Sequence, residues 1–366
     1  MSETQARTFA VQPASPFAST ATPAVPALLA AEWRVTWARD LSPDDARDYD
    51  AFVARAAGGH LAQARAWSAV ACAGRPFAAS LAIVRDAAGA VVGAAQVLRA
   101  RAAGLPLPYA TIERGPVVAD AAAFGPVLRA IARAARRRAI ARLDVMPYWD
   151  EATGGAVRAA LQAGGWRSIQ RPDGAHAATL RLALPRDAAA PLFATSEHKK
   201  LRQEIRYAER AGATARRGTP AELPRFVALY RAVMQEQALH AKSDAWFAAL
   251  AGLDFTPAGT VGLFFTQHAG DPVAAALTIR HGRLVTLLLA ASARAPQDPA
   301  TKFARMVPAL VAAIEWARAR GCDFDLGGVP MAGDDDPKRT AIAQFKRDFS
   351  KTRVELIGQH ARWLIG

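Results

Sequence analysis

The order of apolar and polar segments occurs twice along the chain. Residues 81–85 and 91–98 alternate on either side of a turn, and residues 261–266 and 273–279 do the same. Alternation of this kind on both sides of a short turn predicts a β-hairpin. The sequence therefore predicts one hairpin in each half of the chain.

The segments after each hairpin also correspond. In each half a further strand is followed by an amphipathic helix and then a short apolar strand. These elements are expected at residues 109–112, 121–138 and 140–146 in the first half, and at 284–289, 302–320 and 322–326 in the second. A hairpin followed by a crossover helix and a parallel strand predicts an α/β fold with mixed sheets. The repeat has a constant offset, since Asp325 aligns with Asp144 at a distance of 181 residues (325 minus 144).

The rest of the chain divides around these repeats. Residues 1–30 are rich in Ala, Pro, Ser and Thr and predict a disordered tail. We expect a first domain at 31–190, a second at 191–351, and a final strand at 352–366 that returns to the first domain. No basic segment precedes a long apolar one and no stretch is long enough to cross a bilayer, so a cytoplasmic protein is expected.

Charge and composition restrict the partners. The chain has 366 residues, with 46 Lys and Arg against 32 Asp and Glu, which gives a net charge of +14. Such a surface attracts polyanions such as nucleic acid, nucleotide diphosphates or anionic lipid head groups. The two cysteines lack a CxxC spacing and the seven histidines show no ligand spacing, so no metal site is expected.

Five motifs, in a fixed order, carry a resemblance to a known family. They are His60–Trp67, Tyr109–Val117, Asp144–Pro147, Arg202–Gly212, and the C-terminal pair Phe324–Val329 and Gln344–Phe349. Together they resemble the Fem family of peptidoglycan-bridge aminoacyltransferases, from about Trp33 onward. The resemblance implies two tandem GNAT-like domains.

The resemblance also implies an activity and its partners. It implies transfer of an aminoacyl group from aminoacyl-tRNA to an amine of a UDP-linked or lipid-linked muropeptide, with no cofactor. Peripheral contact with the inner membrane surface is a further expectation. The sequence departs from the family in two places. Ala71 occupies a position where the family often has a lysine. The coiled-coil insertion that many members use for tRNA is missing, because the helix after Pro220 is expected to run on to the strand at Val261.

The resemblance assigns substrate binding to four residues. The helix expected at residues 196–212 has an apolar face and a basic face, and the basic face includes Arg202 and Arg206. By family resemblance these two arginines hold the phosphates of the acceptor, since guanidinium groups pair with phosphate oxygens in a bidentate manner. Arg114 and Trp67, each inside a family motif, are the other expected substrate-binding residues.

Lys346 and Phe345 are the expected catalytic residues. A helix that packs Ile342, Phe345 and Phe349 inward leaves Lys346 at the edge of its buried stripe, where the ammonium can reach a cleft. An aminoacyl ester attacked by an amine needs no protein nucleophile. It needs two aligned substrates and a cation for the tetrahedral oxyanion, and Lys346 is the best candidate for that cation.

Two other functions remain open from the sequence. A GNAT-like acyltransferase could take its acyl group from CoA or a carrier protein and modify a surface polysaccharide or its precursor, although residues 283–320 contain no glycine for a pyrophosphate loop. A non-catalytic protein that binds tRNA or membranes is the other alternative. Asp144 and Asp325 are expected to fix turns at strand ends, and Asp334–Asp336 to lie in a solvated loop.

Overall fold

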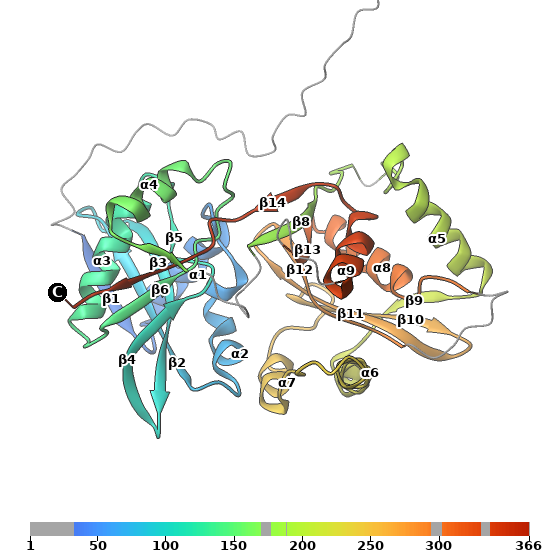
Figure 1. The fold of residues 1–366 in the computed structure, drawn as a ribbon, viewed down its shortest axis with the longest axis horizontal. Coiled ribbons are helices and arrows are strands. Elements are labelled where there is room, and N and C mark those ends of the chain that lie inside the picture. Colours follow the sequence, from blue (N-terminus) through green and yellow to red (C-terminus); the bar gives the residue numbers. More distant parts are fainter. Residues whose placement is uncertain (1–32, 170–176, 188, 294–301, 331–336, 366) are drawn as a thin grey trace, which may run out of the picture.

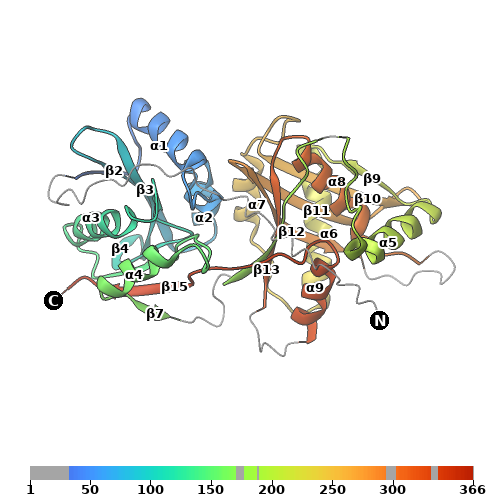
Figure 2. The ribbon, with the colours of Figure 1, turned by 90° about the horizontal axis from the view of Figure 1, so that it is seen from above.

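The computed structural model describes residues 33–169, 177–187, 189–293, 302–330 and 337–365. Two halves lie side by side, each built on one mixed β-sheet (Figures 1 and 2). The α/β fold with two mixed sheets is therefore confirmed. The expected tail at residues 1–30 and the loop Asp334–Asp336 lie outside the described residues.

The first sheet has the strand order β1-β2-β3-β4-β6-β15-β7, and β5 pairs with β3. Its strands are β1 (Arg34–Ala38), β2 (Phe77–Arg85), β3 (Val91–Ala102), β4 (Leu105–Ile112), β5 (Val117–Val118), β6 (Arg142–Val145), β7 (Arg167–Ile169) and β15 (Gln359–Trp363). Helix α3 (Phe124–Arg136) packs on one face of this sheet, and α1 (Pro43–Arg55) and α2 (Ser68–Cys72) pack on the other. Helix α4 (Gly155–Ala163) packs against α3.

The second sheet has the order β14-β8-β13-β12-β11-β10-β9. Its strands are β8 (Ala178–Leu182), β9 (Thr214–Arg217), β10 (Val261–His268), β11 (Asp271–His281), β12 (Leu284–Ser292), β13 (Asp323–Val329) and β14 (Arg353–Glu355). Its main core joins the sheet to α5 (Lys199–Arg210), α8 (Met306–Arg318) and α9 (Pro337–Arg347). A separate core joins it to α6 (Leu223–Glu236) and α7 (Asp244–Ala251), two helices where the sequence predicted one.

The internal repeat is visible in the equivalent elements of the two halves. Helices α3 and α8 begin 182 residues apart (306 minus 124), which agrees with the predicted offset to within one residue. In each half the parallel strand pair that follows places a threonine beside the repeated aspartate: Thr111 beside Asp144, and Thr286 beside Asp325. The two hairpins and the crossover helices form as their periodicity predicts.

The sheets divide the chain differently from the predicted boundary at 190/191. Strand β8 precedes that boundary but belongs to the second sheet, where it pairs with β13. The segment 352–366 also contributes to both sheets, because β14 pairs with β8 whereas β15 lies between β6 and β7. The chain thus crosses between the sheets twice, and of the segment 352–366 only β15 lies in the first sheet.

The two halves share an apolar interface. Residues of α2 and the adjacent turns pack with residues of α6 and α7 in one buried cluster, in which the Trp67 and Trp246 rings meet edge to face with centroids 6.2 Å apart. His281 of the second half contacts the carbonyl oxygen of Val53 in the first at 3.1 Å. Burial of this much apolar surface favours a defined arrangement of the halves.

None of the helices among the described residues is long and apolar enough to cross a membrane.

Candidate functional site

Neighbouring strands separate at one point of the second sheet. The parallel pairing of β12 and β13 ends at Thr286 and Asp325, although both strands continue. Gly327 follows with φ of +77°, in the region that favours glycine, and a Cβ atom there would lie 3.2 Å from the Leu287 carbonyl oxygen. In the first sheet the equivalent strands stay paired through Ile112, and the separation is absent from that part of the structure.

Lys346 places its ammonium at this separation. Its Nζ donates a hydrogen bond to the Gly328 carbonyl oxygen at 2.7 Å, and a Cβ atom on Gly327 would come within 3.7 Å of Nζ. Burial lowers the pKa of Lys346 to about 8, and the nearby Asp325 carboxylate opposes that shift. The ammonium is therefore mostly charged at neutral pH and titrates just above it.

Asp325 is the buried carboxylate beside Lys346. It accepts hydrogen bonds from Thr179 Oγ1, from the Tyr148 hydroxyl at 3.0 Å and from the Gly327 backbone N–H at 2.7 Å. The last of these fixes the turn, as the sequence predicted for this residue. The bond from Tyr148 adds a role that was not predicted, because it ties the first half to the second.

Tyr148 lies between two arginines. Its ring is 5.6 Å from the Arg114 guanidinium and 5.0 Å from that of Arg181, and its centroid is 4.4 Å from that of the His60 ring. Burial raises the pKa of Tyr148, so the hydroxyl stays protonated and donates to Asp325. Cation–π contacts of this kind hold guanidinium groups over a ring face.

His60 is neutral in this environment. Burial lowers its pKa well below the usual range, and the charge of Arg114 adds to the effect. Its Nδ1 accepts a hydrogen bond from the Ala62 backbone N–H at 3.0 Å, which places the ring proton on Nε2. The site thus holds an uncharged imidazole with one N–H donor.

We call His60, Arg114, Tyr148, Arg181, Asp325 and Lys346 the inter-sheet cluster. It contains three cations against one carboxylate, and the neighbouring Glu113 is engaged by Arg75 at 2.8 Å. The Arg181 Nε is buried, lies 3.8 Å from the Asp325 carboxylate and has no hydrogen-bond acceptor among the described residues. The excess positive charge suits a ligand that carries an anionic group.

The other predicted site residues lie in different surroundings. Arg202 donates to the backbone carbonyls of Phe193 and Thr195, so its guanidinium supports the segment before α5. Arg206 is exposed on α5, which lies on the side of the second half away from the first (Figure 1). Trp67 is buried in the apolar interface, and Phe345 packs against Phe349 with centroids 5.3 Å apart. Of the predicted residues, the structure brings together only Lys346 and Arg114 in the inter-sheet cluster.

On the predicted inward face, Phe349 is buried and Phe345 packs on the core as expected, but the prediction for Ile342 of α9 is wrong. Ile342 is 51% exposed, whereas Ala343 is buried. Ala343 and Lys346 are three residues apart and share a helix face, so the orientation that brings Lys346 to Gly328 turns Ile342 outward.

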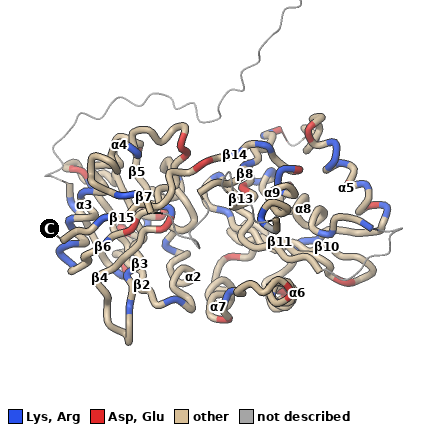
Figure 3. Tube along the Cα trace, viewed as in Figure 1, with Lys and Arg blue, Asp and Glu red and all other residues tan. Residues whose placement is uncertain are grey.

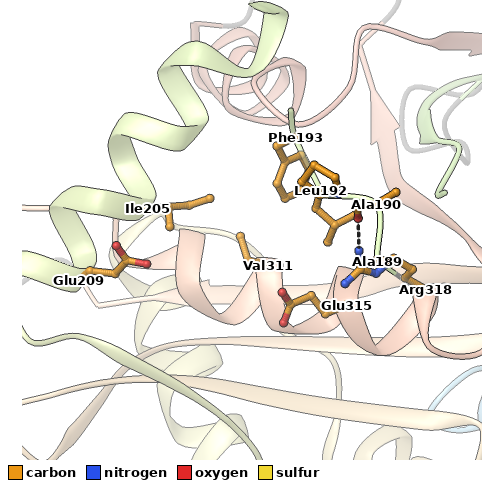
Figure 4. A pocket seen from close by; sticks show the side chains of 10 residues that line it. Ala189, Ala190, Leu192, Phe193, Ile205, Glu209, Val311, Glu315 and Arg318 are labelled. Atoms are coloured by element: carbon orange, nitrogen blue, oxygen red, sulfur yellow. Dashed lines mark hydrogen bonds between the residues drawn. The ribbon is translucent and has the colours of Figure 1, made fainter. Parts of the chain in front are cut away.

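A surface groove of about 420 Å³ lies elsewhere on the second half (Figure 4). It is bounded by α5, α8 and the segment before α5, and Arg318 donates to the Ala190 carbonyl oxygen at its edge at 2.7 Å. Ile205 and Val311 supply apolar walls, and Glu209 is one of its carboxylates. It contains none of the residues of the inter-sheet cluster.

Comparisons with known proteins agree with this architecture. Residues 195–347 match a family described as an acetyltransferase (GNAT) domain. A crystal structure of FemX superposes with a TM-score of 0.71 at 18% identity, over 87% of this chain and 96% of that one. The two mixed-sheet halves of this chain resemble tandem GNAT domains.

Two further structures share this tandem GNAT fold. The C-terminal domain of a putative lysylphosphatidylglycerol synthetase from Agrobacterium fabrum gives a TM-score of 0.54 at 15% identity, over 88% of this chain and 92% of that one. A tandem GNAT protein from the clavulanic acid biosynthesis pathway gives 0.51 at 14%, over 92% and 99%. A search of curated protein sequences finds no significant match. The match of residues 195–347 to an acetyltransferase domain implies transferase activity.

Three residues of the inter-sheet cluster have no role in the sequence prediction. His60 stands in a quoted motif without a role, Tyr148 follows the motif Asp144–Pro147 by one residue, and Arg181 lies on the unpredicted strand β8. A polar residue flanking a buried strand end is a signal that could have found Tyr148. Nothing in the local sequence around Arg181 distinguishes it from the other arginines.

Proposed function

We propose that the chain transfers an aminoacyl group from aminoacyl-tRNA to an amine of a peptidoglycan precursor. The observation that carries the proposal is the half-buried Lys346 ammonium at the point where β12 and β13 separate, beside the Asp325 carboxylate. The five motifs and the tandem GNAT fold support it. The acceptor would be a UDP-linked or lipid-linked muropeptide, whose phosphates match the excess positive charge of the inter-sheet cluster.

The chemistry requires no protein nucleophile. The acceptor amine attacks the ester carbonyl carbon, a C–N bond forms, and the bond from that carbon to the ribose oxygen breaks. The proton lost by the amine is balanced by the one gained by the leaving ribose hydroxyl. Lys346 would stabilise the oxyanion formed between these steps, because a fixed cation in a buried site needs little reorganisation as charge develops.

Donor identity decides between this function and the second candidate, a CoA-dependent or carrier-dependent acyltransferase. The match of residues 195–347 to an acetyltransferase domain favours the second candidate. Purified full-length chain should be incubated with a muropeptide acceptor and either labelled aminoacyl-tRNA or labelled acetyl-CoA, and product formation measured. Transfer from aminoacyl-tRNA alone is expected. Transfer from acetyl-CoA, with micromolar CoA binding by calorimetry, would establish the second candidate instead.

The pKa of Lys346 predicts a pH dependence. Because its value is about 8, the ammonium is present below that pH and lost above it. We expect kcat to be constant near neutral pH and to fall about tenfold per pH unit well above pH 8. Asp325→Asn should shift the fall to lower pH, since the carboxylate raises the pKa of Lys346.

The matched control for this profile is Asp144→Asn, which alters the equivalent carboxylate of the first half. It should leave the midpoint of the kcat profile unchanged. A profile that is flat through pH 9.5 in the wild type, measured with saturating substrates, would show that the charge of Lys346 is not used.

Acceptor binding by the inter-sheet cluster gives a separate prediction. Arg181→Gln removes a guanidinium whose Nε has no acceptor among the described residues. The acceptor KM should rise on the order of tenfold to a hundredfold, because a hydrogen bond to a charged group contributes about 1.5 to 3 kcal/mol. The exposed Arg206→Gln is the comparison, and steady-state kinetics with varied acceptor is the measurement. A larger rise in the acceptor KM for Arg206→Gln than for Arg181→Gln would place the phosphate-binding site on α5 instead.

A further inference from the structure

Exposed apolar side chains gather at one end of the first sheet. Of the six large hydrophobic residues exposed in the described structure, four lie there: Leu105 at 70%, Leu107 at 39%, Trp363 at 62% and Ile365 at 62%. The first two are on β4 and the others are on or next to β15. Scattered single apolar residues need no explanation, but a cluster of four marks a contact surface.

The β3–β4 hairpin carries the first two of these residues away from the body of the protein. It extends beyond β2, whose first residue, Phe77, pairs with Ala100, while the hairpin continues to the pair formed by Ala102 and Leu105. All residues from Arg101 to Pro108 are exposed, and the hairpin extends below the rest of the first half in Figure 1. The Arg101 guanidinium closes the turn through its Nε bond to the Gly104 carbonyl oxygen at 3.0 Å.

Trp363 lies on the same face of the sheet as the exposed leucines of the hairpin. Leu105, Leu107 and Tyr109 alternate along β4 and so share one face of the sheet. Across the next two strands, Tyr109 pairs with Arg142 and Arg142 with Trp363. The Arg142 guanidinium is 5.8 Å from the Tyr109 ring and 5.9 Å from the Trp363 ring, so aromatic and basic groups alternate across this face.

The same end of the sheet is basic. Arg99 on the hairpin reaches the Ala139 carbonyl oxygen at 3.4 Å, which places the end of α3 beside it. Arg136 and Arg137 are exposed there, and Figure 3 shows Lys and Arg along α3 and on the hairpin. Residues 97–109, 133–143 and 359–365, which build this end, contain no Asp or Glu. Asp144, the next residue after Leu143, is buried and pairs with Arg142 at 2.9 Å.

We propose that this end of the first half, which we call the hairpin surface, docks on a bilayer that contains anionic lipids. Leu105 and Leu107 would enter the region between head groups and acyl chains, Trp363 would lie at the interface, and the arginines would face the lipid phosphates. A polynucleotide is the other polyanion that a basic face can bind. The exposed aliphatic side chains favour a bilayer, because contacts to nucleic acid use cations and aromatic stacking instead.

The proposal does not depend on the identity of the acyl donor or acceptor. The hairpin surface lies at the start of β4 and β6, whereas Arg114 and Tyr148 of the inter-sheet cluster follow the ends of these strands. A membrane-bound molecule would therefore keep the cluster away from the lipid head groups, on the opposite end of the same strands. In that orientation the cluster would meet the phosphates of a UDP-linked acceptor and not those of a lipid-linked one, which lie at the head groups. Docking and catalysis can accordingly be tested separately.

Vesicle flotation with the purified full-length chain tests the proposal. The wild type should float with vesicles of equal parts phosphatidylcholine and phosphatidylglycerol, and should remain in the dense fraction with phosphatidylcholine alone. Leu105→Glu with Leu107→Glu should reduce the floated fraction at least tenfold. Leu239→Glu, which changes another exposed leucine on the second half, is the matched control and should float like the wild type.

A second double variant distinguishes loss of membrane binding from misfolding of the hairpin. Trp363→Thr with Ile365→Thr changes only side chains exposed at the other side of the surface and should also weaken flotation, with an unchanged circular dichroism spectrum. The proposal is overturned if the wild type does not float with anionic vesicles, or if both double variants float as well as it does. It is also overturned if the hairpin variants lose binding to total tRNA while vesicle binding is unchanged.

Discussion

Lys346→Met is expected to lower kcat on the order of a hundredfold to a thousandfold, by comparison with the loss of one oxyanion donor in other enzymes. Methionine keeps the length and the apolar stem of the side chain, so the packing of α9 survives while the bond to the Gly328 carbonyl oxygen and the charge are lost. The loss should appear in kcat and leave the acceptor KM nearly unchanged, since the bound substrates carry no oxyanion before the amine attacks. Single-turnover kinetics with aminoacyl-tRNA is the measurement.

Lys200→Met is the control for this variant. Lys200 is an exposed lysine that pairs with Asp348 at 2.7 Å, so its loss removes a charge from the surface and should not change kcat. Lys346→Arg should restore little activity, because a planar guanidinium does not place its charge where the ammonium was. If Lys346→Met turned over within about threefold of the wild type, the cation would have no part in the rate and alignment alone would account for it.

Asp325→Ala is expected to lower the free energy of unfolding by about 3 to 5 kcal/mol, the usual result of removing one partner from a buried set of charges. The substitution leaves Lys346 and Arg181 without their counter-charge, and Tyr148 without its acceptor. Urea denaturation, followed by circular dichroism and by tryptophan fluorescence, measures the change. Both signals report on both halves of the protein. If the halves unfolded at different urea concentrations, two separate unfolding transitions would be visible.

Asp323→Ala is a matched control two residues away on the same strand. The Asp323 side chain is 26% exposed and pairs with Arg186 at 2.9 Å, so its loss should cost about 0 to 1 kcal/mol. Equal losses for the two variants would mean that the surroundings of Asp325 admit enough water to screen its charge.

The repeat could be predicted from the sequence because its signals are local. Alternation on either side of Gly89 and Gly270 follows from the geometry of a strand pair, and the helices that became α3 and α8 show their periodicity within one segment. The inter-sheet cluster has no such signal. His60, Tyr148 and Arg181 come from three distant segments and meet only because both sheets are complete.

The sheet to which β8 belongs and the orientation of α9 also depend on contacts that are distant in the sequence. Nothing local tells β8 which sheet to join, since either edge offers unpaired backbone groups, and the choice depends on β13 and β14 beside it. The orientation of α9 was assigned from apolar spacing alone. The hydrogen bond from Lys346 to Gly328 of β13, 18 residues earlier in the sequence, sets the orientation of the helix instead.

The position of β15 has a consequence for how the chain folds as it is made. Strand β15 lies between β6 and β7, and pairs with both. The ribosome synthesises β7 about 190 residues before β15 (359 minus 169), at rates on the order of ten residues per second. For that interval β6 has an open edge and β7 lacks the partner it will have. The half that is translated first is therefore the half that is finished last, and a nascent-chain experiment should find its protection against proteolysis only after the final strand has left the exit tunnel.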